Sequence, residues 1–187
     1  MKILDITYVA LFAAFMGVLG MIPPIMLSFT PVSITLQTLG VLLAGGVLGA
    51  RRGAWSMTIF LLLVAAGAPL LSGGRGGLGV FFGPSAGYLI SWPITAFCVG
   101  YLISRFSKLR FWRILLINLT VGIFLVYLIG IPVQAFIMHL PLIKTIQISL
   151  VYIPGDALKA TIASYLTYRL LKAPAIKRNF HKNVETL

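Results

Sequence analysis

The chain has 187 residues, of which 59% are hydrophobic and only 10% are charged, and its mean hydropathy is +1.03. A soluble domain carries about a quarter charged residues, so this composition excludes a soluble protein and indicates an integral membrane protein. The net charge of +12 does not indicate nucleic-acid binding. The basic residues gather in short stretches between apolar segments, where they encode membrane orientation.

Six apolar segments approach the length of about 20 residues that a bilayer span requires. They are predicted at residues 6–23, 35–48, 55–70, 84–104, 114–136 and 146–171. The first lacks a clear cleavage context and is interpreted as a retained span. The predicted fold is an all-α membrane domain of six transmembrane helices over residues 1–172, followed by a basic tail over residues 173–187. The second segment is short, so part of the connection before it is expected to dip into the protein.

Basic residues are distributed unevenly between the two sides of these segments. Twelve of the 15 Lys and Arg residues lie near the N-terminus, between the second and third or fourth and fifth segments, or after the sixth. Under the positive-inside rule these positions are cytoplasmic, so both termini are predicted inside the cell. The outer side keeps only Arg75 and Lys144.

The first helix carries small residues at four-residue spacing: Ala10 and Ala14, then Ala13 and Gly17. Such pairs allow close helix contact in membranes. These small residues can serve either packing within this chain or docking to a second protein, and the sequence does not distinguish the two.

Two connections on the outer side carry candidate site residues. Residues 72–83 contain six glycines around Arg75, and glycine lets the backbone approach a ligand closely. We interpret this stretch as a mobile lid between the third and fourth helices, with Arg75 able to bind a carboxylate. The alternative is a flexible hairpin whose arginine touches solvent or lipid headgroups. Ser85 and Tyr88 then open the fourth helix, where free N–H groups can hold a polar ligand group.

Polar residues inside the apolar segments are the remaining candidates. Gln37 and Gln134 can face a cavity or hydrogen-bond another helix, because an unsatisfied amide in lipid is costly. Asp156 is the only acidic residue between Asp5 and Glu185, and Lys159 follows it on the same helical face. Ionisable groups within a span usually mark a substrate or ion site, although a structural ion pair is the alternative. Pro154-Gly155 is expected to break or start the helix just before them.

The sequence lacks the motif of a P-loop ATPase and any His/Cys/acid cluster for a metal. It therefore indicates a solute-binding membrane protein with neither an energy-coupling site nor a cofactor.

Three stretches resemble one known family. They are residues 30–38, the glycines of 73–77 with Gly83-Pro84-Ser85-Ala86-Gly87-Tyr88-Leu89, and Ile153-Pro154-Gly155-Asp156-Ala157-Leu158-Lys159. They are similar to BioY, the biotin-specific S component of energy-coupling factor (ECF) transporters, over about residues 10–163. The tail carries no such resemblance.

The resemblance implies a prokaryotic-type plasma-membrane protein that captures biotin from outside and is not an enzyme. It implies a transmembrane T component and two ABC-type ATPases as partners, with Ala10, Ala13 and Ala14 contacting the T component. Asp156 and Lys159 match the polar pair of the sixth helix. Biotin's ureido N–H groups suit the carboxylate and its carbonyl suits the ammonium, while Arg75 can reach the valerate carboxylate. The bicyclic ring would rest on Phe81, Tyr88 and aliphatic side chains.

Two rival functions are considered. A stand-alone secondary biotin carrier would need no partner. A rhomboid-like intramembrane serine hydrolase is suggested by Gly83-Pro84-Ser85-Ala86-Gly87, but such a serine needs a base within hydrogen-bond reach. The sixth helix has no histidine, and His139 lies at the outer end of the fifth helix, where it is not expected to serve.

Overall fold

The structure, a computed structural model, describes residues 3–28, 30, 32–106 and 109–172. Two residues of the predicted outer connection, Phe29 and Pro31, and the predicted basic tail lie outside the described residues. Within those ranges the elements are all helical. They are α1 (Ile3–Gly20), α2 (Gln37–Leu48), α3 (Ala50–Ala65), the 3₁₀ turn η1 (Leu78–Phe82), α4 (Ala86–Ser104), α5 (Phe111–Ile117), the π turn η2 (Asn118–Gly122), α6 (Ile123–Ile137), α7 (Leu142–Ser149), the 3₁₀ turn η3 (Leu150–Tyr152) and α8 (Ile153–Lys172).

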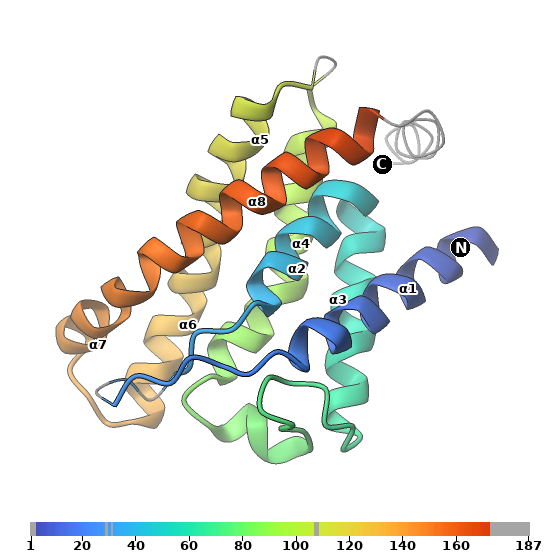
Figure 1. The fold of residues 1–187 in the computed structure, drawn as a ribbon. Helices are drawn as coiled ribbons and strands as arrows, with labels where there is room; N and C mark the ends of the chain where they lie inside the picture. Colours follow the sequence, from blue (N-terminus) through green and yellow to red (C-terminus); the bar gives the residue numbers. More distant parts are fainter. Residues whose placement is uncertain (1–2, 29, 31, 107–108, 173–187) are drawn as a thin grey trace.

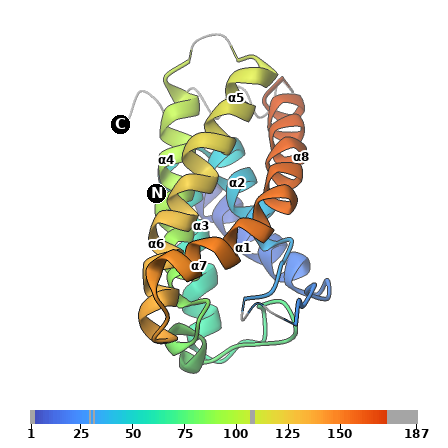
Figure 2. The ribbon, with the colours of Figure 1, turned by 90° about the vertical axis from the view of Figure 1, so that its left-hand side faces the viewer.

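The helices pack around a central group formed by α2, α3 and α4, with α1 against α2 and α3 and with α8 crossing α2 (Figure 1). The connections around residues 21–36, 66–85 and 138–141 gather at one end of the molecule. The α2–α3 corner, the end of α4, the start of α5 and the end of α8 lie at the opposite end, as the turned view also shows (Figure 2). Each predicted cytoplasmic connection thus lies at the same end, which is the arrangement that the positive-inside prediction requires.

Within the described ranges, three helical segments are long and apolar enough to cross a membrane: α1, α4 and the continuous stretch Phe111–Ile137. The α2 helix is apolar but shorter. The predicted all-α membrane fold is confirmed, and α3 and α8 overlap the third and sixth predicted segments.

Two predicted helix boundaries differ most from the structure. The third helix begins at Ala50 rather than Trp55, so Arg51 and Arg52 lie within α3. Arg52 forms an ion pair with Asp5 of α1, which explains how a charged turn is accommodated there. The sixth predicted segment began inside α7, a separate short helix.

The predicted break at Pro154-Gly155 is a helix start. The interruption between α7 and α8 lies at η3, and Pro154 occupies the first turn of α8. Proline is tolerated there because the first-turn N–H groups have no intrahelical acceptor.

Glycines in the central group bring helix backbones into contact. A Cβ on Gly45 would lie 2.5 Å from the carbonyl oxygen of Ala96, and one on Gly100 would lie 2.5 Å from the backbone nitrogen of Ala50. The small residues of α2 therefore serve packing within this chain.

Candidate functional site

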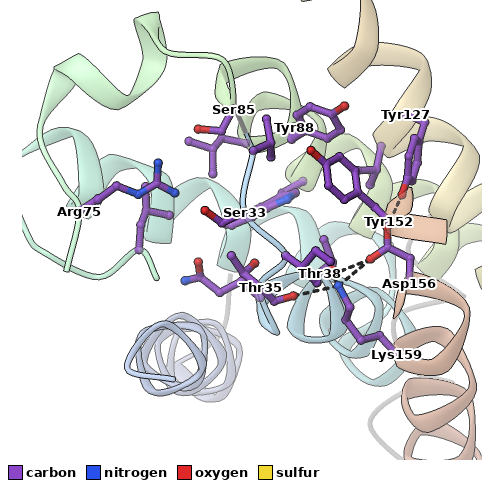
Figure 3. A pocket seen from close by; sticks show the side chains of 17 residues that line it. Ser33, Thr35, Thr38, Arg75, Ser85, Tyr88, Tyr127, Tyr152, Asp156 and Lys159 are labelled. Atoms are coloured by element: carbon purple, nitrogen blue, oxygen red, sulfur yellow. Dashed lines mark hydrogen bonds and ion pairs between the residues drawn. The ribbon is translucent and has the colours of Figure 1, made fainter. Parts of the chain in front are cut away.

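A cavity lies where the connections before α2 and before α4 meet the helix ends. Side chains from residues 32–38, the Gly-rich loop, α4, α6, η3 and the start of α8 line it (Figure 3). The six residues predicted to bind substrate, Asp156, Lys159, Arg75, Tyr88, Ser85 and Gln37, all line this one cavity. The lining includes residues 32–35, so the connection before α2 dips into the protein as expected.

Asp156 and Lys159 form an ion pair at the cavity wall. The Lys159 ammonium lies 2.6 Å from Oδ1 of Asp156, and the two side chains are only 7% and 13% exposed, respectively. The same ammonium donates to the carbonyl oxygen of Thr35 at 2.9 Å and to Oγ1 of Thr38 at 3.0 Å. An ammonium has three donors, so each one already has a protein acceptor. Lys159 therefore fixes the carboxylate and the start of α2 in place.

The second oxygen of Asp156 has a different partner. The Tyr127 hydroxyl on α6 donates to Oδ2 at 2.6 Å. Because a carboxylate accepts about four hydrogen bonds, Oδ2 keeps acceptor capacity toward the cavity. Tyr127 lies in an apolar helix 29 residues before Asp156, and no local pattern in the sequence marks it as a site residue.

Tyr88 presents its ring to the cavity while its hydroxyl is engaged elsewhere. The hydroxyl donates to Oε1 of Gln134 at 2.8 Å and lies 3.3 Å from Oγ of Ser149. Its ring meets the Tyr127 ring edge-on at 6.2 Å. Gln134 thus forms the helix-to-helix hydrogen bond that was one of its two predicted alternatives.

Gln37 is 1% exposed, and its side-chain amide forms three hydrogen bonds to backbone groups of the protein. Its nitrogen donates to the carbonyl oxygens of Met16 at 3.2 Å and Leu70 at 3.0 Å, and its oxygen accepts from the backbone N–H of Ser72 at 3.2 Å. Gln37 therefore joins the end of α1 and the Gly-rich loop to the start of α2.

Arg75 extends from the Gly-rich loop into the cavity region (Figure 3). Its Nε donates to the carbonyl oxygen of Ser72 at 3.3 Å, and its side chain is otherwise exposed. The loop reaches this position through left-handed backbone at Gly73, Gly74 and Gly77, with φ between +69° and +85°, a region that glycine adopts without strain.

Ser85 occupies the cap position before α4, which begins two residues later than predicted. Its hydroxyl makes no cap hydrogen bond. Trp92 also lines the cavity, although it was not among the predicted site residues. It lies on the same face of α4, one turn after Tyr88 and two turns after Ser85. Phe81 packs against the hydrophobic core. It is not among the described cavity-lining residues, so the prediction that it supports the ligand ring finds no support in this geometry.

The alanines of α1 point in different directions. Ala10 and Ala14 lie exposed on one face, whereas Ala13 is buried in the core. Only the first two are available to a second protein.

A metal centre requires a cluster of ligating side chains, and a serine hydrolase requires a base beside its serine. Among the described residues, no group of three or more His, Cys, Asp or Glu side chains could hold a metal. The described residues that line the cavity with Ser85 include no histidine to serve as its base.

The fold and the cavity define a multi-span membrane protein that binds a small polar solute. The BioY family profile matches residues 1–175. The chain belongs to the BioY family.

Several members of this family are close to it. A Bacillus subtilis protein named "Probable biotin transporter BioY" is 50% identical over 173 residues, covering 92% of this chain and 93% of the relative. A Rhizobium etli "Biotin transporter BioY" is 46% identical over 171 residues, covering 87% and 90%. A crystal structure of the S-component for biotin from an ECF-type ABC transporter superposes with a TM-score of 0.91 at 36% identity, covering 96% of both chains.

Proposed function

We propose that this protein is the membrane-embedded biotin-binding component of an ECF-type transporter. The observation that carries the proposal is the buried Lys159–Asp156–Tyr127 group at a cavity, within a fold that superposes on a biotin S-component over nearly its whole length. The protein is a biotin transporter of the plasma membrane and acts by binding and delivery rather than by catalysis.

Asp156 is the residue that binds the ureido ring. Lys159 and Tyr127 hold its two oxygens from opposite sides, and the spare acceptor capacity of Oδ2 suits a ureido N–H. Lys159 was predicted to donate to the ureido carbonyl. Since its three donors have protein acceptors, we assign it instead to fixing and charge-balancing the carboxylate.

Arg75 binds the other end of the ligand. Its position in the loop and its exposed guanidinium allow a bidentate, charge-assisted hydrogen-bonded contact with the valerate carboxylate. Ser85 contributes a hydroxyl and Tyr88 a ring surface, while Gln37 keeps the loop in place.

The transport partners are a T component in the membrane and two ABC-type ATPases, with Ala10 and Ala14 as the docking face of α1. The specific observation behind this is that two small residues four apart remain exposed on a helix whose other small residues pack inward. Surrounding lipid covers the remaining apolar surface. A stand-alone carrier would instead take up biotin in cells that lack a T component.

The experiment is to purify the protein in detergent from biotin-containing medium and measure bound biotin by mass spectrometry. Calorimetry on the stripped protein then gives the Kd. We expect stoichiometric biotin for the wild type and far less for Asp156→Asn. A stably folded wild type that neither retains nor rebinds biotin would overturn the proposal. Uptake with and without co-expressed T component and ATPases separates the ECF transporter from the stand-alone carrier.

A further inference from the structure

The indole N–H of Trp92 is a buried donor without an acceptor among the described residues. Trp92 is 4% exposed, and its Nε1 has no hydrogen-bond partner there. The indole nitrogen is a donor only, so nothing but an incoming acceptor can satisfy it. Native proteins leave few such groups unpaired, and each one calls for a specific explanation.

The position of the ring relates this donor to the ligand. Trp92 lines the same cavity as Asp156 and Lys159. Its ring is supported by the ring of Phe60, with centroids 6.0 Å apart and planes inclined at 36°. It follows Tyr88 by one helical turn, so it lies deeper in the cavity wall than the start of α4. An acceptor that reaches its N–H by way of this cavity would belong to the bound ligand.

The hydrogen-bond donors of Lys159 and Tyr88 are already engaged by protein acceptors, so the ligand needs another donor. A ureido ring presents N–H groups and one carbonyl oxygen. Asp156 accepts from the N–H side, while the three donors of Lys159 already have protein acceptors. The Tyr88 hydroxyl points to Gln134.

The buried Tyr152 hydroxyl also lines the cavity without a partner among the described residues, but a hydroxyl can donate or accept, whereas an indole N–H can only donate. The ureido carbonyl, which is an acceptor only, therefore matches the indole N–H of Trp92, a buried donor outside the ion pair.

We infer that the Trp92 indole N–H donates to the ureido carbonyl oxygen of bound biotin and thereby discriminates for a carbonyl at that position. This inference rests on the proposed biotin-binding function. Asp156 and Trp92 would then hold the donor and acceptor edges of the same ring, one from α8 and one from α4.

The test replaces a single atom. The chain has three tryptophans, and the other two, Trp55 and Trp112, are exposed. A Trp55→Phe/Trp112→Phe protein leaves Trp92 as the only tryptophan. Incorporating β-(3-benzothienyl)alanine in this background exchanges the indole N–H for sulfur in a ring of nearly the same shape.

We expect the exchange to raise the Kd for biotin roughly 2- to 10-fold, the range for one neutral hydrogen bond. The Kd for 2-thiobiotin, whose thiocarbonyl is a poorer acceptor, should change less. In the unmodified single-tryptophan protein, the ¹⁵N-indole N–H resonance should move downfield on addition of biotin, which a purely packing role would not cause.

Each opposing outcome has a distinct meaning. An indole resonance that biotin leaves in place, or equal losses for biotin and 2-thiobiotin, overturns the inference. Failure of the unmodified single-tryptophan protein to bind biotin, with wild type failing as well, counts against the proposed function instead. Trp92→Phe provides a second variant. Its Kd should rise more for biotin than for 2-thiobiotin, and an equal rise for the two ligands would also overturn the inference.

Discussion

Tyr127 donates its hydroxyl hydrogen to Oδ2 of Asp156 across 2.6 Å, on the opposite oxygen from the one that Lys159 contacts. The carboxylate is thereby held at both oxygens by two different helices, α6 and α8. Its orientation toward the cavity thus depends on a contact between distant parts of the chain.

The first prediction follows from that contact. Tyr127→Phe removes the hydroxyl but keeps the ring against Tyr88, so the fold should persist. A hydrogen bond to a charged group contributes about 1.5–3 kcal/mol. Loss of the orienting contact should therefore raise the biotin Kd roughly 10-fold or more, measured by calorimetry. Tyr165→Phe is the matched control, because Tyr165 is exposed on α8. Equal affinities for the two variants would show that Tyr127 does not orient the carboxylate.

The second prediction concerns the ion pair. Asp156→Asn replaces an acceptor by a donor facing the ureido N–H groups, and Lys159→Met leaves the carboxylate without its counter-ion. Removing one member of a buried charged pair costs about 2–5 kcal/mol, so Kd should rise roughly 30- to several-thousand-fold in both variants.

The double variant Asp156→Leu/Lys159→Leu separates a binding pair from a structural one. A buried ion pair with a structural role alone can be replaced by apolar residues at little cost in stability. We expect a folded double variant, by its thermal transition in detergent, with no measurable biotin binding. Near-native affinity in that variant would contradict the assignment of Asp156.

The third prediction concerns Arg75. Arg75→Ala should weaken binding of biotin more than binding of a biotin amide, since only the free acid carries the charge that the guanidinium meets. The comparison of the two Kd ratios is the measurement. An equal loss for acid and amide would mean that Arg75 does not bind the carboxylate.

The fourth prediction uses the two directions of the α1 alanines. Ala14→Trp adds a ring on the exposed face, so biotin binding should persist while ATP-driven uptake with the T component and ATPases is abolished. Ala13→Trp places the same ring in the core and should instead lower the thermal transition and binding together. Loss of biotin binding in Ala14→Trp as well would show that the face of α1 that carries Ala14 serves packing within the chain rather than docking.

Local spacing predicted the parts of the site that lie close in sequence. Asp156 and Lys159 are three residues apart on one helix, so their pairing follows from helical periodicity. The same periodicity places Trp92 on the face of Ser85 and Tyr88, and it would have identified Trp92 had the face been followed for another turn.

Contacts between distant elements could not be predicted in this way. Nothing in the apolar sequence of α6 marks Tyr127 as the partner of Asp156, because that pairing depends on how two helices cross. Gln37 was recognised as a buried amide that needs partners, but spacing does not distinguish a ligand from the backbone carbonyls of Met16 and Leu70 that it contacts. The separate helix α7 was missed because its polar residues interrupt the apolar pattern.

The π turn η2 has a consequence for chain length. Each residue of an α-helix turns the next by about 100°, so a deletion between Tyr88 and Trp92 would move them off their common face. The Phe111–Ile137 segment differs because η2 already contains one residue more than an α-helical turn. Deleting Leu119, a partly exposed member of that turn, would convert it to an α turn and leave Tyr127 facing Asp156. A chain one residue shorter at this point would therefore keep the contact.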